Sequence, residues 1–326
     1  MTTLVTGGAG FVGQHLVDLL QARGEDVRVL DLVPPNGADF VQGSVTDPAA
    51  ARKSCEGVSS VFHLAGNAQL WARDRNIFEQ INFIGTKVML EAAVAAGVKK
   101  FVHCSSLTTL VGVTAPIGQS SADETVRLDE DEMLGPYPRS KLLAERAVEA
   151  AAGGGLDAVI AIPTEPLGPG DEGLTPPTRM ILDFLNGKTP AFIDCELNFV
   201  PVQSLSEGFI AARDKGVHGE RYLLGGENIE LKTLLSMLNE LTGVSMPKSK
   251  LPYGIALAAG IVDTKFIAPL TGKQPKAPLT GVRLAGRRVR FSSEKAKNDL
   301  DWVAAPVAPT LSETINWFAE KGLFQK

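Results

Sequence analysis

The chain has 326 residues, of which 44% are hydrophobic and 21% are charged, a balance typical of a globular protein with an ample core. Its net charge of −5 at pH 7 argues against a nucleic-acid partner, which would require a basic face. The three cysteines, Cys55, Cys104 and Cys195, are odd in number and widely spaced, which favours free thiols in a reducing compartment over disulfides.

Strand-like and helix-like segments alternate through the first half of the chain. Short apolar strand patterns lie at residues 3–6, 26–30, 40–42, 60–64, 101–104 and 158–162. Helical patterns lie between several of them, at residues 11–22, 49–54, 76–96 and 140–152. This alternation predicts an α/β fold of the Rossmann type, in which a doubly wound parallel sheet has helices on both faces.

A glycine-rich turn, GGAGFVG at residues 7–13, connects the first strand to the first helix. Such a turn presents bare backbone N–H groups and a helix N-terminus to a pyrophosphate. The second strand ends in Asp31, where a carboxylate can accept hydrogen bonds from a nucleotide ribose. A tight turn without a ligand has the same pattern and is the alternative interpretation. The residues expected to contact a dinucleotide are Gly7, Gly10, Phe11, Val12, Gly13 and Asp31.

The neighbours of Asp31 favour one dinucleotide over the other. A carboxylate at this position would repel the 2′-phosphate of NADP. The next residues, Leu32 and Val33, are apolar, so no cation immediately after Asp31 offsets that repulsion. The sequence therefore predicts NAD as the cofactor.

Tyr137 and Lys141 are four residues apart at the start of a helical pattern. This spacing puts both side chains on one face of a helix, which we expect to begin near Gly135 or Pro136, because Pro138 must fall in the first turn. A neighbouring cation lowers the pKa of a phenol, so the pair can act as an acid/base unit during hydride transfer. An exposed helix start with an incidental tyrosine and lysine is the alternative.

Ser105 and Ser106 follow the strand at residues 101–104, at the edge of the sheet where ligands of doubly wound folds bind. A serine hydroxyl there can donate to a substrate oxygen and hold it against Tyr137. The alternative is a turn serine that satisfies local backbone groups. Thr108 and Thr109 are competing hydroxyls, and Thr108 is a candidate substrate contact.

The second half of the chain has a different texture. Prolines and glycines are frequent at residues 163–190, strand patterns lie at 198–202 and 221–224, and helical patterns lie at 231–241, 293–299 and 311–319. We expect residues 1–162 to form an NAD-binding domain. We expect residues 163–326 to form mainly a smaller substrate-binding cap that is partly interleaved with the sheet.

Neither a metal site nor a membrane-spanning segment is expected. The four histidines lie apart from each other and from the cysteines, which argues against a metal site. The chain begins directly with a strand pattern, and its longest apolar stretch, residues 255–262, is shorter than the ~20 residues that span a bilayer. We therefore expect a cytoplasmic protein without an integral membrane span. A core helix accounts for residues 255–262, and a peripheral membrane contact or a lipid-like substrate channel is the alternative.

Several motifs together resemble those of the extended short-chain dehydrogenase/reductases, also called the NAD-dependent epimerase/dehydratase family. They are TGGAGFVG at residues 6–13, HLAG at 63–66, NFIGT at 82–86, Ser105-Ser106, the Tyr137–Lys141 pair and GPGD at 168–171. The resemblance implies that Ser106, Tyr137 and Lys141 form the catalytic triad and that Lys141 also holds the nicotinamide ribose. It further implies cofactor contacts from Leu64, Ala65, Gly66, Asn82 and Pro163.

Within that family the chain is most similar to the hopanoid-associated sugar epimerases and to the dihydroflavonol-reductase-like branch, in residues 70–74, 197–200, 219–228 and 290–297. It departs from the family pattern in two places. Gly43-Ser44 stands where relatives have Gly-Asp, which removes an expected side-chain contact to adenine. Pro201, Gln203 and Ser204 replace the usual residues of a His-Val-Asp-Asp run, at the position expected for the hinge of the cap.

The prediction about the substrate rests mainly on Glu165. Nucleotide-sugar enzymes of the family usually have Asn near this position, and a carboxylate would face a diphosphate unfavourably unless it is protonated or turned away. With the apolar residues 255–262 and 266–270, this favours hydride transfer at a secondary alcohol or ketone of a bulky, partly apolar, hydroxysteroid- or dihydroflavonol-like small molecule. The alternatives are a sugar or nucleotide-sugar epimerase or dehydratase with tightly held NAD, and a non-catalytic dinucleotide sensor. Relatives often pair through two helices, so a homodimer through residues 76–96 and 140–152 is expected.

Overall fold

Seven parallel strands form the central sheet of the protein, for which the computed structural model describes residues 2–35 and 37–324. Residues 1, 36, 325 and 326, which the predicted domain ranges include, lie outside the described residues. The strands stand in the order β11 (Arg221–Leu224), β7 (Ala158–Pro163), β5 (Lys100–Cys104), β4 (Val58–His63), β1 (Thr2–Thr6), β2 (Asp26–Asp31) and β3 (Asp39–Gln42). The predicted α/β fold with a doubly wound parallel sheet is confirmed.

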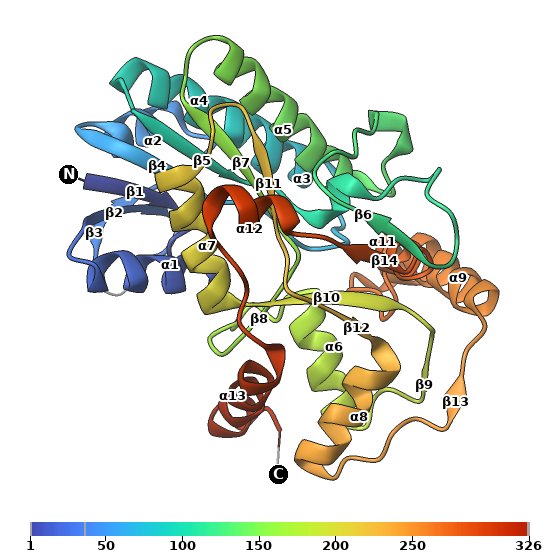
Figure 1. Cartoon of the computed structure of the whole chain (residues 1–326). Helices are drawn as coiled ribbons and strands as arrows, with labels where there is room; N and C mark the ends of the chain where they lie inside the picture. The colour runs from blue at the N-terminus through green and yellow to red at the C-terminus, as the bar shows by residue number, and fades with distance from the viewer. Residues whose placement is uncertain (1, 36, 325–326) are drawn as a thin grey trace.

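Helices cover both faces of this sheet (Figure 1). One layer contains α2 (Pro48–Cys55), α4 (Gly85–Ala96) and α5 (Pro136–Gly153), and the other contains α1 (Phe11–Ala22), α7 (Val202–Lys215) and α12 (Glu294–Leu300). Successive strand side chains point to opposite faces. Accordingly, Leu4 joins the core under α2, α4 and α5, whereas Val5 joins the core under α1 and α7.

The helical segment predicted at residues 76–96 is present but irregular. It begins as α3 (Asn76–Phe78), widens into a π-helical segment (Glu79–Ile84) and continues as α4. Single π-helical turns inside α-helices are frequent at functional sites. The wider segment contains Asn82, whose side chain is buried and bonded to residues outside the helix, and those bonds favour the departure from α geometry. The predicted start of α5 near Pro136 is confirmed.

A smaller sheet lies beyond the carboxyl edge of the large one. Its central strand β10 (Glu196–Pro201) pairs in parallel with β8 (Glu165–Leu167) and antiparallel with β12 (Glu227–Glu230). Three helices pack with it in a third apolar core: α6 (Pro176–Leu185), α8 (Leu231–Thr242) and α13 (Val307–Glu320). The chain returns to the large sheet at β11, so residues after 163 contribute to both sheets.

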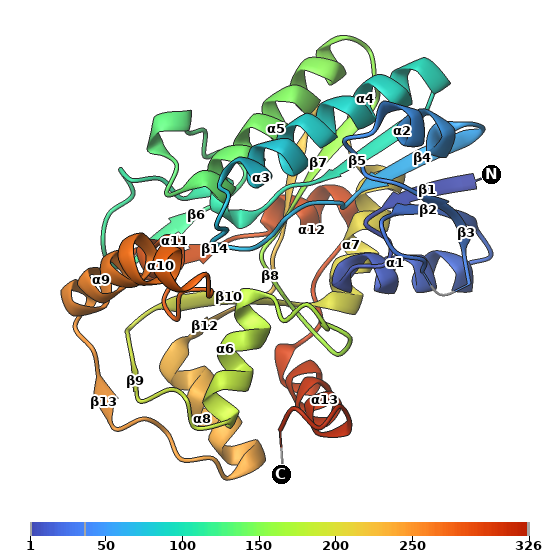
Figure 2. The same ribbon diagram turned by 180° about the vertical axis from the view of Figure 1, so that it is seen from behind.

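Among the remaining elements, α9 and α10 lie at the outer edge of the molecule (Figure 2). Helix α9 (Tyr253–Val262) continues through a π-helical segment (Asp263–Ile267) into α10 (Ala268–Thr271), and α11 (Leu279–Ala285) follows. Two short strand pairs join β6 (Ser120–Ala122) to β14 (Val289–Phe291) and β9 (Ala191–Phe192) to β13 (Ser249–Lys250). Short 3₁₀ helices cover Leu107–Leu110 and Glu130–Glu132. Cys55, Cys104 and Cys195 are free thiols, as predicted.

Candidate active site

The glycine turn lies between β1 and α1, at the carboxyl edge of the large sheet. Gly7 has a φ of 72°, and a Cβ at this residue would lie 2.8 Å from backbone atoms of Ala65. A Cβ at Gly13, in the first turns of α1, would lie 2.0 Å from the carbonyl oxygen of Gly7. No side chain caps α1, whose N-cap residue is Gly10, so its first N–H groups remain available to an anion. The turn therefore fits a dinucleotide pyrophosphate.

Asp31 stands at the end of β2, beside this turn. Its carboxylate accepts hydrogen bonds from the backbone N–H of Ala9, at 3.0 Å, and from that of Leu32, at 2.6 Å. These bonds hold the carboxylate next to the first helix turn while leaving lone pairs on both oxygens. The position fits the ribose contact predicted from the sequence.

Strand β4, which pairs with β1 in the sheet, leads into Leu64, Ala65 and Gly66. The backbone N–H of Ala65 donates to Thr6 Oγ1 at 3.2 Å, which ties this segment to β1. A Cβ at Gly66 would lie 3.0 Å from Asn82 Oδ1 and 3.3 Å from Lys141 Nζ. Three residues from distant parts of the chain, all predicted to contact the cofactor, therefore meet at this point.

Asn82 fixes the backbone beyond Gly66. Its Oδ1 accepts from the Asn67 N–H at 2.7 Å, and its Nδ2 donates to the Asn67 carbonyl at 3.1 Å and to Ser140 Oγ at 2.9 Å. Asn67 is missing from the sequence prediction, although it directly follows the HLAG motif. The side chain of Asn82 thus links the 64–67 segment to the helix that carries Tyr137 and Lys141.

Lys141 and Tyr137 are both buried at the start of α5, with exposed fractions of 5% and 7%. The Lys141 ammonium donates to the Cys104 carbonyl, at the end of β5, over 2.9 Å. The Tyr137 ring lies against Phe78, with ring centroids 6.1 Å apart, and its hydroxyl interacts with that of Ser106. The three residues predicted to form the catalytic group therefore converge at the carboxyl edge of β5.

The prediction that Lys141 lowers the pKa of Tyr137 below its ordinary value is wrong. Burial raises the pKa of Tyr137 to about 12, and the Ser106 hydroxyl lowers it only in part. Burial also lowers the pKa of Lys141, because the ammonium loses solvation. Loss of solvation is the largest cause of the Tyr137 shift, and spacing in the sequence does not report it, so the pKa of Tyr137 lies above its ordinary value.

Ser106 is positioned by its own loop. It begins the short 3₁₀ helix Leu107–Leu110, and its Oγ accepts from the Thr108 N–H at 3.3 Å and from Thr108 Oγ1 at 3.1 Å. Thr108, a predicted substrate contact, therefore supports the Ser106 hydroxyl in this structure. Thr109 Oγ1 lies 3.0 Å from the Ser106 carbonyl oxygen and 2.7 Å from Glu145 Oε1, and it can donate its one proton to either acceptor.

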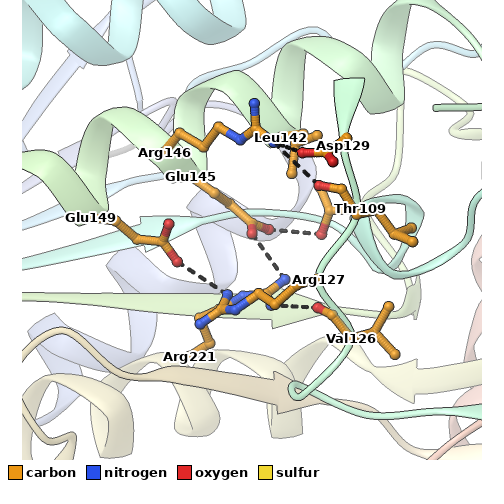
Figure 3. A pocket seen from close by; sticks show the side chains of 10 residues that line it. Thr109, Val126, Arg127, Asp129, Leu142, Glu145, Arg146, Glu149 and Arg221 are labelled. Carbon is orange, nitrogen blue, oxygen red and sulfur yellow. Dashed lines mark hydrogen bonds and ion pairs between the residues drawn. The ribbon is translucent and has the colours of Figure 1, made fainter. Parts of the chain in front are cut away.

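A buried ion pair behind this loop was not predicted from the sequence. Glu145 Oε2 lies 2.9 Å from Arg221 Nη2, and both side chains are 2% exposed (Figure 3). The Ser105 hydroxyl also bonds to Glu145. Glu145 lies four residues after Lys141, so helical spacing could have placed it on the same face of α5, but its partner Arg221 comes from a distant strand.

Arg221 also donates to the carbonyls of Glu124, at 3.0 Å, and Val126, at 2.8 Å. A cavity of about 220 Å³ opens beside the ion pair and is lined by further charged residues (Figure 3). They include Arg127, Arg146 and Glu149. Neither Tyr137 nor Ser106 lines this cavity, so it lies apart from these two predicted site residues.

Glu165 lies two residues after Pro163, the last residue of β7, where β8 pairs Glu165 with Phe199 of β10. Its Oε2 is buried and has no hydrogen-bonding partner, and the neighbouring Thr164 hydroxyl is in the same condition. Burial raises the pKa of Glu165 to about 8. Buried polar atoms normally have partners, so two unpaired groups at one strand end indicate a place for a ligand.

The two departures from the family pattern have local structural roles. Ser44 Oγ bonds to Thr46 Oγ1 at 2.8 Å and accepts from the Thr46 N–H, so its side chain belongs to the turn before α2. Ser204 connects α7 to the C-terminal segment, because its Oγ accepts from the Ala305 N–H at 3.1 Å and its carbonyl accepts from Trp302 Nε1 at 2.9 Å. Across residues 2–35 and 37–324, no three His, Cys, Asp or Glu side chains are grouped as a metal site would require.

Comparisons with known proteins agree with this geometry. Residues 3–225 match the model of a family described as the NAD dependent epimerase/dehydratase family. Sterol demethylase protein B of Methylococcus capsulatus is 33% identical over 334 residues, which cover 99% of this chain and 100% of that protein. The mouse sterol-4-alpha-carboxylate 3-dehydrogenase, decarboxylating, is 30% identical over 317 residues, covering 90% and 84%. The crystal structure of gox2253 has a TM-score of 0.86 at 33% identity and covers 99% of each chain.

Removal of the buried carboxylate should destabilise the protein strongly. We expect Glu145→Ala to lower the free energy of unfolding by about 3–5 kcal/mol, because Arg221 would keep a buried charge without its partner. The matched control is Glu149→Ala, which removes the partner of Arg127 from a pair with side chains 61% and 38% exposed and should cost less than about 1 kcal/mol. Urea unfolding measures both changes, and equal losses for the two variants would contradict the role of Glu145.

A methyl group in the glycine turn should weaken cofactor binding. Gly13→Ala brings a Cβ against the Gly7 carbonyl, so the turn must move away from the pyrophosphate, and we expect NAD affinity to fall roughly tenfold or more. Gly153→Ala, at the end of α5 with open space around it, is the control and should leave affinity unchanged. Equilibrium titration with NADH, followed by its fluorescence, tests this; undiminished affinity in a folded Gly13→Ala protein would refute the assignment.

Proposed function

The chain belongs to the NAD-dependent epimerase/dehydratase family, and on that premise we propose that it oxidises or reduces a secondary alcohol or ketone on a bulky, partly apolar molecule. It is an NAD-dependent oxidoreductase of α/β fold. The observation that carries the proposal is the convergence of Tyr137, Lys141 and Ser106, all buried, at the carboxyl edge of β5 beside the glycine turn.

The residues around the turn have distinct proposed parts in holding the cofactor. NAD, when bound, supplies the hydride acceptor, and NADH supplies the donor. We assign the pyrophosphate to the α1 N-terminus between Gly7 and Gly13, and the ribose hydroxyls near the turn to Asp31. Backbone contacts from Gly10, Phe11 and Val12 complete this end of the site. The contacts proposed for the nicotinamide half come from Leu64, Ala65, Gly66, Asn82, Lys141 and Pro163.

Tyr137 is the proposed proton donor in the reductive direction. Its pKa of about 12 keeps the phenol protonated at neutral pH, so it can give its proton to the substrate oxygen as a carbonyl becomes an alcohol. Ser106 would hold that oxygen by a second hydrogen bond. In the oxidative direction the phenolate must form first, and the Lys141 charge would stabilise it. Reduction is therefore favoured near neutral pH and oxidation at higher pH.

Glu165 is the proposed polar contact to the substrate. Its Oε2 has no hydrogen-bonding partner, and its pKa of about 8 keeps the carboxylic acid protonated at neutral pH. It can therefore donate a hydrogen bond to a hydroxyl or carbonyl oxygen. A neutral carboxylic acid does not repel a diphosphate, so the charge of Glu165 does not by itself disfavour a nucleotide sugar. Two relatives with sterol in their names support a large apolar substrate such as a hydroxysteroid or a dihydroflavonol. Thr108 is a further proposed contact.

Sugar epimerisation or dehydration with tightly held NAD is the second candidate function. The likeness of residues 70–74 and 219–228 to hopanoid-associated sugar epimerases favours it. Net formation of NADH from alcohols supports the first function, whereas co-purified NAD without net redox change supports the second. A non-catalytic dinucleotide sensor would show neither reaction, and the buried Tyr137 and Lys141 argue against it.

We also propose a cytoplasmic homodimer. Three free thiols are consistent with a reducing compartment. Helices α4 and α5 pack side by side in the layer over one face of the sheet, which makes their outer surfaces candidates for a four-helix dimer contact. Sedimentation equilibrium measures the mass of the assembly directly.

Loss of the phenolic hydroxyl should remove catalysis without removing cofactor. We expect Tyr137→Phe to lower kcat/KM by about 10²–10⁴-fold, the usual contribution of a positioned acid or base, because the ring still packs on Phe78 while the proton donor is lost. Steady-state NADH oxidation with a ketone substrate measures this, and NADH affinity is the control for an intact site. Full activity in the Phe variant would contradict the mechanism.

The titration of Glu165 should be visible in the pH dependence of stability. The folded protein keeps this proton up to a pKa of about 8, whereas the unfolded chain loses it near its ordinary value of 4.5. Between these values the folded state binds more protons, so stability falls as pH rises. We expect Glu165→Gln to gain stability relative to the native protein from about pH 5 to about pH 8. Unfolding at a series of pH values tests this, and parallel curves for both proteins would show that Glu165 is already ionised.

A further inference from the structure

An apolar surface is exposed along α9, the following π-helical segment and α10. Within Tyr253–Thr271, an 18-residue stretch has a mean hydropathy of 1.3, yet only 22% of that stretch is buried. Its exposed large apolar side chains are those of Ile255, Val262, Phe266, Ile267 and Leu270, with Leu270 87% exposed. We call these five residues the α9–α10 surface. Its exposure differs from that of a core helix, which the sequence analysis favoured, so the apolar stretch calls for another explanation.

The helix is fixed to the body of the protein by its other side. Ala256, Gly260, Thr264 and Ala268 recur every four residues and are buried. Asp263 Oδ2 accepts from the Lys276 N–H at 2.7 Å and from the Ala277 N–H at 3.2 Å, and Thr264 Oγ1 accepts from the Leu279 N–H at 2.9 Å. The segment is long and apolar enough to cross a membrane, but these contacts hold it along α11 with its apolar side outward.

The charge around this surface is opposite to that of the whole protein. Residues 244–278 contain five lysines and one aspartate, whereas the chain carries a net charge of −5. The aspartate, Asp263, is committed to backbone N–H groups. Lys265, Lys273 and Lys276 are exposed beside the apolar residues. Lysines flanking an exposed apolar helix are complementary to the anionic head groups of a lipid surface.

The surface is also close to α5, the helix that carries Tyr137. Helix α9 packs on α11, where a Cβ at Gly260 would lie 3.2 Å from Val282 Cγ2. From α11, Arg283 Nη1 donates to the Leu134 carbonyl at 3.3 Å, just before α5 begins and presents Tyr137. Figure 2 shows α9, α10 and α11 together at the end of the molecule beside β14. Helix α11 thus contacts both α9 and the segment just before α5.

We infer that the α9–α10 surface seats the protein on an anionic lipid membrane, with its apolar side chains among the acyl chains and its lysines at the head groups. The protein then lies on the membrane without spanning it. The surface brings an apolar substrate to the Tyr137 site from the lipid phase. This last part rests on the proposed function, whereas membrane binding does not.

The test is co-sedimentation of the full chain, without substrate, with vesicles of phosphatidylcholine or of phosphatidylcholine mixed with phosphatidylglycerol. We expect binding to the mixed vesicles that weakens as salt rises. The double variant Phe266→Ser/Leu270→Ser and the double variant Lys265→Glu/Lys273→Glu should each bind at least about tenfold more weakly. The control is Val303→Ser, which changes an apolar side chain that is 68% exposed elsewhere and should bind like the native protein.

Native protein that stays in the supernatant with the mixed vesicles, or variants that bind as well as the control, would overturn the inference. A second copy of the chain on this surface is a further outcome that would overturn it. In that case Phe266→Ser/Leu270→Ser would halve the mass of the assembly in sedimentation equilibrium, and the native protein would not bind vesicles. NADH oxidation with a water-soluble ketone is measured in parallel. Activity without vesicle binding refutes only the membrane contact, and binding without activity refutes only the proposed function.

Discussion

One face of α5 buries a phenol, an ammonium and a carboxylate in succession, and the rest of the site depends on how the protein satisfies these three groups. Lys141 donates to the Cys104 carbonyl at the end of β5, and Glu145 pairs with Arg221 from the edge strand β11. Both contacts tie the helix to strand ends of the large sheet. Tyr137 is then held at the same carboxyl edge of the sheet as the glycine turn, with β4 standing between β5 and β1.

The sequence alone predicts the parts of this arrangement that depend on short-range patterns. The alternation of strand and helix patterns that predicts the sheet, and the Tyr137–Lys141 spacing and Pro138 that predict the start of α5, are both local features of the sequence. Arg221 could not be assigned to Glu145, because their pairing depends on where β11 enters the sheet. The π-helical turn at Asn82 also depends on long-range bonds to Asn67 and Ser140. The direction of the Tyr137 pKa shift was missed because it depends on burial, which spacing does not report.

In the second half of the chain, the surroundings of Glu165 are largely apolar. Leu167 and Phe199 belong to the core beneath the small sheet, and Glu165 stands in the same pair of strands with one oxygen unpaired. Such a site suits a largely apolar molecule with one well-placed oxygen. The exposed apolar residues of α9 and α10 extend the same preference to the outside of the protein.

The central claim is that hydride passes between NAD and a substrate that leaves the enzyme in a changed redox state. The most direct measurement follows deuterium from NADH labelled at the nicotinamide C4 into the product of a ketone such as a 3-ketosteroid. The account predicts deuterium at the new alcohol carbon, with one NAD released per product. Return of all deuterium to enzyme-bound cofactor, with no net NADH consumed during turnover of a sugar nucleotide, would contradict it.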